Sequence, residues 1–241
     1  MQRRLNGPTG IGSVNHVTRT ALSLLNRLVD LNFDHIAKRI VALVNDPPVD
    51  EKNLLVIAHL CTESAILQPN RAVLYARLCR ALPDRIQRVR GQLVRKHVVD
   101  TLVNGLEEGY QTSPDVTGTL KRRYFGVVRF LGELYKVGMS PEQMIRGYVK
   151  QLLGSVELPL DADLEALCIL LDTTGRFLDT AKAKSQMDSH FIRISELAAT
   201  TGIPMRIRFM LQVTHPGSTS LLMSHLSTRT FAIDVRRSGR R

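Results

Sequence analysis

Apolar residues recur every three or four positions along most of the chain, the spacing that places them on one face of an α-helix. The clearest example is the segment 125–135, in which Leu131 and Leu134 belong to one apolar face. Gly138 follows as a stop signal, and Ser140-Pro141-Glu142 has the composition of a helix start. The segment is therefore predicted to be one helix joined to the next by a tight turn.

The same spacing predicts ten helices and no strand. Proline and glycine mark most of the breaks between them, because proline cannot donate to the helical ladder and glycine favours helix ends. The predicted helices are 17–28, 33–44, 50–67, 71–82, 86–106, 119–137, 142–153, 161–171, 182–199 and 204–213.

The helices group in sequence as five antiparallel pairs, at intervals of about 40 to 47 residues, as in HEAT-type arrays. A helix pair cannot bury its apolar face alone, so such pairs stack on their neighbours. The predicted fold is all-α, an α-solenoid of about five antiparallel HEAT-like helix pairs over 14–213. An irregular helical bundle is the competing architecture. We expect a flexible segment at 1–13 and an irregular basic tail at 214–241.

Composition adds a bias toward anionic partners. Lys and Arg outnumber Asp and Glu by 33 to 22, which gives a formal net charge of +11. The three cysteines, Cys61, Cys79 and Cys168, are far apart within apolar helical segments and are predicted to be reduced core residues. No apolar run reaches the length of a membrane span, so we expect a cytoplasmic protein with no membrane partner.

Recognisable catalytic chemistry is missing from the sequence. It contains no glycine-rich phosphate loop, no zinc-binding H-E-x-x-H and no G-x-S-x-G nucleophile motif. The seven histidines are scattered, without the spacing that a metal site needs. The chain is therefore predicted to be a binding protein without enzymatic activity, cofactor or metal.

Clusters of basic residues favour contact with RNA phosphates, since such groups release counterions on binding. Solvated helix faces are the alternative explanation for each cluster. The chain has no tryptophan and only 5% aromatic residues, so base stacking is poorly supported and any RNA contact is predicted to be non-specific. The candidate RNA-binding residues are Arg85, Arg88, Arg90, Arg95, Lys96, Lys121, Arg122 and Arg123.

Five segments in the same order resemble the middle domain of the translation initiation scaffold, initiation factor four-G. They are "LLNRLVDLNFDHIAKRI" at 24–40, "AVLYARLCRAL" at 72–82, "KRRYFGVVRFLGELYKVGM" at 121–139, "LLDTTGRFLDTAKAKSQMDSHF" at 170–191 and "RIRFMLQ" at 206–212. Beyond residue 212 the chain departs from the family pattern, which continues with an acidic residue and a helix ending near tryptophan.

This resemblance implies a scaffold that grips the DEAD-box RNA helicase initiation factor four-A and holds its two lobes in a part-open orientation. The RNA contact predicted from the basic clusters would be with mRNA, and other initiation factors are further candidate partners. The residues that match the helicase-binding stretches are Asn26, Arg27, Phe33, Arg206, Arg208 and Phe209.

The two aromatic residues in this set have a structural alternative to helicase contact. Phe33 could staple the second helix onto the core, and Phe209 could seal the last repeat. Two other functions remain open as well. One is a related middle domain from nonsense-mediated decay or from a poly(A)-binding-protein-interacting factor, and the other is a plain RNA-binding solenoid without a helicase partner.

Overall fold

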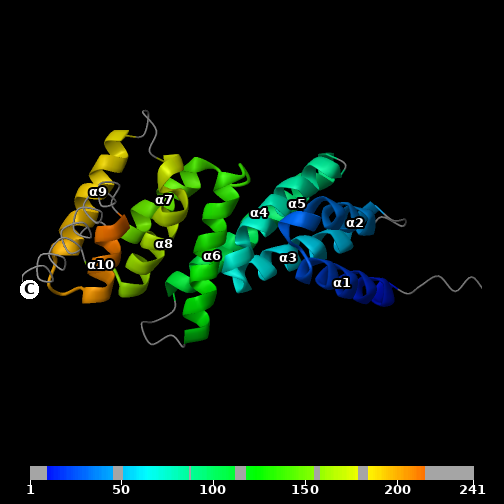
Figure 1. Cartoon of the computed structure of the whole chain (residues 1–241), viewed down its shortest axis with the longest axis horizontal. Coiled ribbons are helices and arrows are strands. Elements are labelled where there is room, and N and C mark those ends of the chain that lie inside the picture. The colour runs from blue at the N-terminus through cyan, green and yellow to red at the C-terminus, as the bar shows by residue number, and fades with distance from the viewer. Residues whose placement is uncertain are drawn as a thin grey trace, which may run out of the picture. The chain divides into compact units, whose positions relative to one another are not determined.

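A computed structural model describes residues 10–45, 51–86, 88–111, 118–154, 158–178 and 184–214; within these helices, the side chains of residues 10–15, 88, 89, 110, 111 and 184 are not described. The described residues form ten α-helices, two single 3-10 turns and no strand (Figure 1). The ten predicted helices are thereby confirmed. The predicted tail lies outside the described residues beyond Thr214.

The helices follow one another with short connections. The 3-10 turns Asp30–Asn32 and Pro69–Arg71 lead into the second and fourth helices. The α-helices are α1 Gly10–Asn26, α2 Phe33–Asn45, α3 Glu51–Leu67, α4 Ala72–Arg85, α5 Arg88–Gln111, α6 Gly118–Lys136, α7 Glu142–Leu153, α8 Asp161–Leu178, α9 Lys184–Ala199 and α10 Met205–Thr214.

Helices α1 and α8 extend furthest beyond their predicted bounds. Helix α1 begins at Gly10, within the segment 1–13 that was expected to be flexible. Helix α8 continues from the predicted end at residue 171 to Leu178. The polar residue Thr174 is fully buried in this extension, and its hydroxyl donates to the carbonyl oxygen of Leu170 at 2.7 Å. A threonine satisfied by its own helix does not end that helix.

The chain divides into two compact units, Met1–Arg146 and Gly147–Arg241. The division falls within α7. In the first unit, α1 packs on α3 and α3 on α5, while α2 packs on α4 and α4 on α6 (Figure 1). Equivalent helices of successive pairs therefore stack on one another, which is the arrangement of a HEAT-type repeat. Fully buried side chains at its centre include Leu25, Ile57, Tyr75 and Phe130.

Helix α6 approaches the end of α3 so closely that only glycine fits between them. A Cβ atom on Gly126 would lie 2.2 Å from the carbonyl oxygen of Ile66. Gly138 then ends α6 with φ +72°, a conformation that side chains disfavour. The amide of Met139 closes the turn by donating to the carbonyl of Leu134 at 2.8 Å. The predicted stop at Gly138 is confirmed.

In the second unit, α10 packs against both α8 and α9. Ile207 and Leu211 form its buried side. All three cysteines of the chain are buried free thiols, as predicted. Among the described residues, no helix combines the length and apolarity needed to cross a membrane.

Candidate partner-binding surfaces

The turn between α1 and α2 carries the first group of predicted helicase-binding residues. Asn26 and Arg27 are exposed at its start. The side chain of Asn32 holds the turn from within, since its Oδ1 accepts from the amide of Val29 at 2.8 Å and its Nδ2 donates to the carbonyl of Arg27 at 2.7 Å. The turn is therefore a fixed element that presents exposed side chains.

Arg71 lies in the turn that leads into α4. It stabilises the turn between α1 and α2 through hydrogen bonds from a different helix pair. Its Nη2 atom donates to the carbonyl oxygens of Leu25 at 3.1 Å and Asn26 at 3.4 Å, and also to that of Leu28. The last carbonyl groups of a helix have no partner within the helix and carry partial negative charge. A guanidinium is a suitable cap for them, because it combines positive charge with several donors.

Phe33 begins α2 and is buried, with 8% of its surface exposed. The guanidinium carbon of Arg77 lies 4.4 Å from the centre of its ring, and Nη1 of the same arginine pairs with Asp30 at 2.5 Å. A partner would have to displace Arg77 to touch the ring. The structure thus favours the packing role for Phe33 over direct helicase contact.

The second group of predicted helicase-binding residues lies on α10. Arg206 forms an ion pair with the buried carboxylate of Glu165 on α8. Arg208 is half-buried, and its Nε atom has no hydrogen-bond partner. Phe209 is 59% exposed, so the alternative that it seals the last repeat is wrong. Ile207 and Leu211 fill that role because they point into the contact with α8 and α9.

The first cluster of predicted RNA-binding residues is partly neutralised by acids from elsewhere in the chain. Arg85 pairs with Asp34 of α2 at 3.1 Å, and Arg95 lies 3.9 Å from Asp84. The side chain of Arg88 lies outside those that are described. Arg90 is half-buried and Lys96 is exposed. These two are the members of this cluster that form no ion pair within the described residues.

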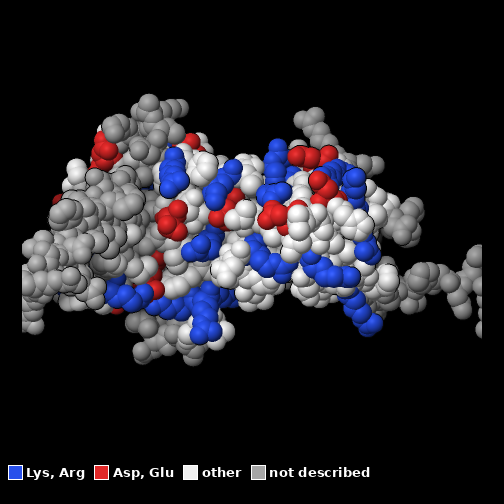
Figure 2. Space-filling view, viewed as in Figure 1, with Lys and Arg blue, Asp and Glu red and all other residues white. Residues whose placement is uncertain are grey.

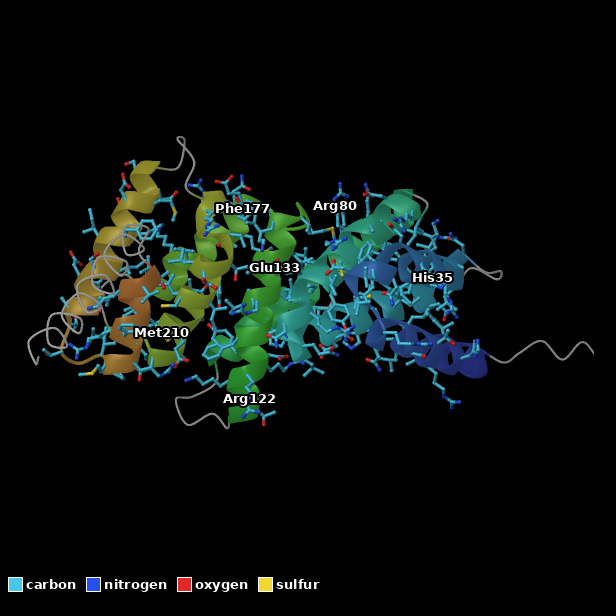
Figure 3. All side chains as sticks on the ribbon, viewed as in Figure 1. His35, Arg80, Arg122, Glu133, Phe177 and Met210 are labelled. Carbon is cyan, nitrogen blue, oxygen red and sulfur yellow. The ribbon has the colours of Figure 1, made fainter. Side chains whose placement is uncertain are left out.

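The second cluster stands at the beginning of α6. Arg123 was expected to be exposed, but it is half-buried. Its two terminal nitrogens donate to Glu63 of α3 at 2.6 and 2.7 Å. These hydrogen bonds hold the pKa of Glu63 below its usual value. Arg122 is exposed at this N-terminal end of α6 (Figure 3), where Figure 2 shows basic side chains gathered. The ammonium group of Lys121 lies 5.4 Å from the centre of the Phe125 ring.

The two basic clusters do not form one patch. Helices α5 and α6 run antiparallel, with Gly109 against Tyr124 and therefore beside the second cluster. Lys96 precedes Gly109 by 13 residues, which is about 20 Å of helix. An RNA strand bound at one cluster would have to cross this distance to reach the other.

Arg71 and Arg77 were missed as contributors to the candidate surface. Their partners around the turn after α1 are 43 to 47 residues earlier in the chain, about one helix pair away. No local pattern identifies such contacts. The repeat period was the available signal, since Arg77 follows Asp30 by 47 residues.

A family model for the MIF4G domain matches residues 19–214. The chain belongs to the MIF4G domain family. The match covers both compact units and ends at the last residue of α10.

Individual relatives carry the same domain within much longer proteins. The chain is 31% identical over 228 residues to eukaryotic translation initiation factor 4 gamma of Schizosaccharomyces pombe, covering 81% of this chain and 16% of that protein. It is 30% identical to eukaryotic translation initiation factor 4 gamma 1 of Mus musculus, covering 80% and 14%. The chain thus spans about a sixth or less of the length of these relatives.

A solved structure has the same fold. The MIF4G domain of Trypanosoma cruzi translation initiation factor EIF4G5 matches with a TM-score of 0.50 and 16% sequence identity, over 83% of this chain and 93% of that one. This likeness confirms the predicted HEAT-like, all-α architecture of the MIF4G domain.

The Arg123–Glu63 pair gives a stability prediction. Replacement of Arg123 by alanine leaves a partly buried carboxylate without its donors, and we expect the free energy of unfolding at pH 7 to fall by about 1–2 kcal/mol after allowance for solvent screening. The pKa of Glu63 is lowered from 4.5, so its stabilisation is present above that pH and is lost as pH falls through the folded-state value. Urea unfolding followed by circular dichroism should therefore show the two proteins converging below pH 4.5.

The neighbouring exposed residue supplies the control. Arg122→Ala should leave the free energy of unfolding almost unchanged at both pH values. An equal loss in Arg122→Ala and Arg123→Ala, or a difference that persists unchanged in acid, would contradict the assignment of the ion pair to Glu63.

Proposed function

We propose that this MIF4G domain is a translation initiation scaffold that binds and stimulates a DEAD-box RNA helicase of the initiation factor four-A type in the cytoplasm. The observation that carries the proposal is the family match over residues 19–214 together with relatives named as translation initiation factors. We take 14–213 as the functional domain. The scaffold itself performs no catalysis, and its effect is to shift the conformational equilibrium of its partner.

The distribution of the candidate residues supports a partner with two lobes. Asn26 and Arg27 are exposed in the first compact unit, and Arg208 and Phe209 are accessible in the second. The first unit thus offers two polar side chains, and the second offers one polar and one aromatic side chain. Arginine and aromatic residues are enriched among those that dominate binding energy at protein interfaces. Phe33 and Arg206 belong to the proposed site as supports, since one is buried and the other is paired with Glu165.

The first test is a titration of the domain into the RNA-stimulated ATPase assay of the initiation helicase, with a control that lacks helicase. Saturable stimulation is expected. Arg27→Ala and Phe209→Ala, one in each unit, should each raise the concentration for half-maximal stimulation about tenfold, as expected for interface residues worth about 1.4 kcal/mol.

Ile192→Ala is the matched control, because Ile192 is also an exposed apolar residue of the second unit, with 62% of its surface accessible. It should leave stimulation unchanged. Absence of stimulation by the folded parent domain would contradict the proposal. Retained RNA binding would then favour a plain RNA-binding solenoid, and binding to a different factor would favour a relative from nonsense-mediated decay or a poly(A)-binding-protein-interacting factor.

We further propose that RNA contacts the basic end of α6 without sequence preference. Arg122 and Lys121 are the candidates there, while Arg90 and Lys96 form a second, separate candidate point on α5. Arg85, Arg95 and Arg123 already have acidic partners, so they contribute less charge than the sequence suggests.

Arg122→Ala should weaken binding to unrelated single-stranded RNAs by a similar factor and reduce the slope of log K against log salt by about 0.7 to 1. Fluorescence anisotropy at several salt concentrations measures both quantities. Lys38→Ala, which removes an exposed charge of α2, is the control. An unchanged slope in Arg122→Ala would exclude Arg122 from the RNA contact.

A further inference from the structure

Two histidines meet where α3 packs on α5 in the first unit. His59 of α3 and His97 of α5 lie edge to face, with ring centres 6.1 Å apart and ring planes inclined by 68°. His59 is exposed, whereas His97 is half-buried. Because helices α1, α3 and α5 stack on one another, a change of charge in either ring acts on the stacking of the repeat.

One nitrogen of His97 has no partner. Its Nε2 atom is shielded from solvent and forms no hydrogen bond within the part of the chain that the structure describes. Buried polar atoms nearly always have a hydrogen-bond partner, so an exception calls for an explanation. In a neutral imidazole one nitrogen is an acceptor, but in the charged ring both nitrogens are donors. Protonation would therefore place a positive charge and an unsatisfied donor at a half-buried position, which is unfavourable.

The surroundings of His97 favour its neutral form. Burial lowers its pKa from the ordinary value of 6.5, and the neighbouring His59 lowers it further. Asp100, on the same helix, acts in the opposite direction and does not outweigh these two effects. The folded protein therefore binds a proton at His97 less readily than the unfolded chain does.

Two acidic residues of the neighbouring helices are already held by arginines. Glu63, one turn along α3 from His59, accepts hydrogen bonds from Arg123 of α6 at 2.6 and 2.7 Å. Asp84 of α4 is held by one arginine of its own helix and by one of α5. Helix α1, which also packs on α3, has no acidic residue in its sequence. Neither carboxylate is thus free to neutralise a charged His97.

We propose that His59 and His97 form a pH-sensitive contact, which holds α3 against α5 while both rings are neutral and loosens the two helices when the rings take up protons. Neutral rings attract each other in the edge-to-face arrangement, because the positive edge of one meets the negative face of the other. Two charged rings at the same separation repel each other. Histidine changes charge between about pH 5 and 8, so the contact responds to mild acidification.

Loosening of α3 would reach the first candidate surface, a consequence that rests on the proposed function. Helix α3 packs on α1, which ends at the turn that presents Asn26 and Arg27. Mild acidification is therefore expected to weaken binding of the helicase through the first unit. The second unit is left unchanged, since both histidines of the pair belong to the first.

Urea unfolding of the full 241-residue chain at about pH 7.5 and about pH 5.5 tests the contact. Since the pKa of His97 is lowered, its stabilisation is present above 6.5 and is lost as pH falls through the folded-state value. The equilibrium constant for folding should therefore fall several-fold more in the parent than in His97→Phe, which keeps an aromatic ring without a titratable nitrogen. Glu63 does not interfere, because its pKa is lowered from 4.5 and it stays charged at both pH values.

Nuclear magnetic resonance of the histidine rings provides a second readout that does not depend on unfolding. The titration midpoint of His97 should rise in His59→Gln, because that substitution removes the neighbouring positive charge. His35→Gln is the matched control, since His35 is exposed on α2 (Figure 3). It should leave both the midpoint of His97 and the pH dependence of unfolding unchanged.

An equal loss of stability in the parent and in His97→Phe would overturn the proposal, as would a His97 midpoint that is the same with and without His59. If circular dichroism shows that His97→Phe does not fold, His97→Gln takes its place. No helicase is present in either experiment, so their failure is distinct from failure of the proposed function.

Discussion

The guanidinium of Arg71 stands among the last carbonyl groups of α1, and the geometry of the first candidate surface depends on it. The hydrogen bonds to the carbonyl groups of Leu25 and Leu28 are partly buried, where an unsatisfied acceptor is costly. Because one side chain from the second helix pair satisfies several of them, the turn after α1 is fixed relative to α4. Arg77 continues this attachment by covering Phe33 and pairing with Asp30. Exposed Asn26 and Arg27 are thereby presented from a rigid base.

Arginine joins neighbouring helices at several further points in the structure. Arg85 reaches α2, Arg123 reaches α3 and Arg206 reaches α8, each through a carboxylate. The net charge of +11 therefore overstates the basic surface that is free for RNA. Arginine suits these contacts because its planar group forms several hydrogen bonds and stays charged when partly buried. The positive charge that remains available to RNA phosphates lies on a few exposed side chains, such as Arg122 and Lys96.

Helix positions could be predicted from the sequence because apolar spacing and breaks at proline and glycine are local signals. The turn at Gly138 and the burial of Leu131 and Leu134 follow directly from them. The extension of α8 could not be predicted, since its polar residue Thr174 is satisfied within the helix.

The site residues were harder to predict because their surroundings come from distant parts of the chain. In the sequence, Arg123 is one of three adjacent basic residues. Its ion-pair partner Glu63 is 60 positions earlier in the chain. Phe209 resembles a core aromatic residue in sequence, but the rotation of α10 against α8 and α9 turns it outward. Helical spacing gives the faces of a helix, and only the packing decides which face is buried.

We propose that each compact unit of this MIF4G domain contacts the initiation helicase. Hydrogen exchange of the domain, measured with and without the initiation helicase, tests this claim most directly. The account predicts slower exchange in the turn at 26–33 and in α10 within the same complex, with α9 unaffected. Protection confined to one unit, or absent from both segments while the helicase is bound, would contradict it.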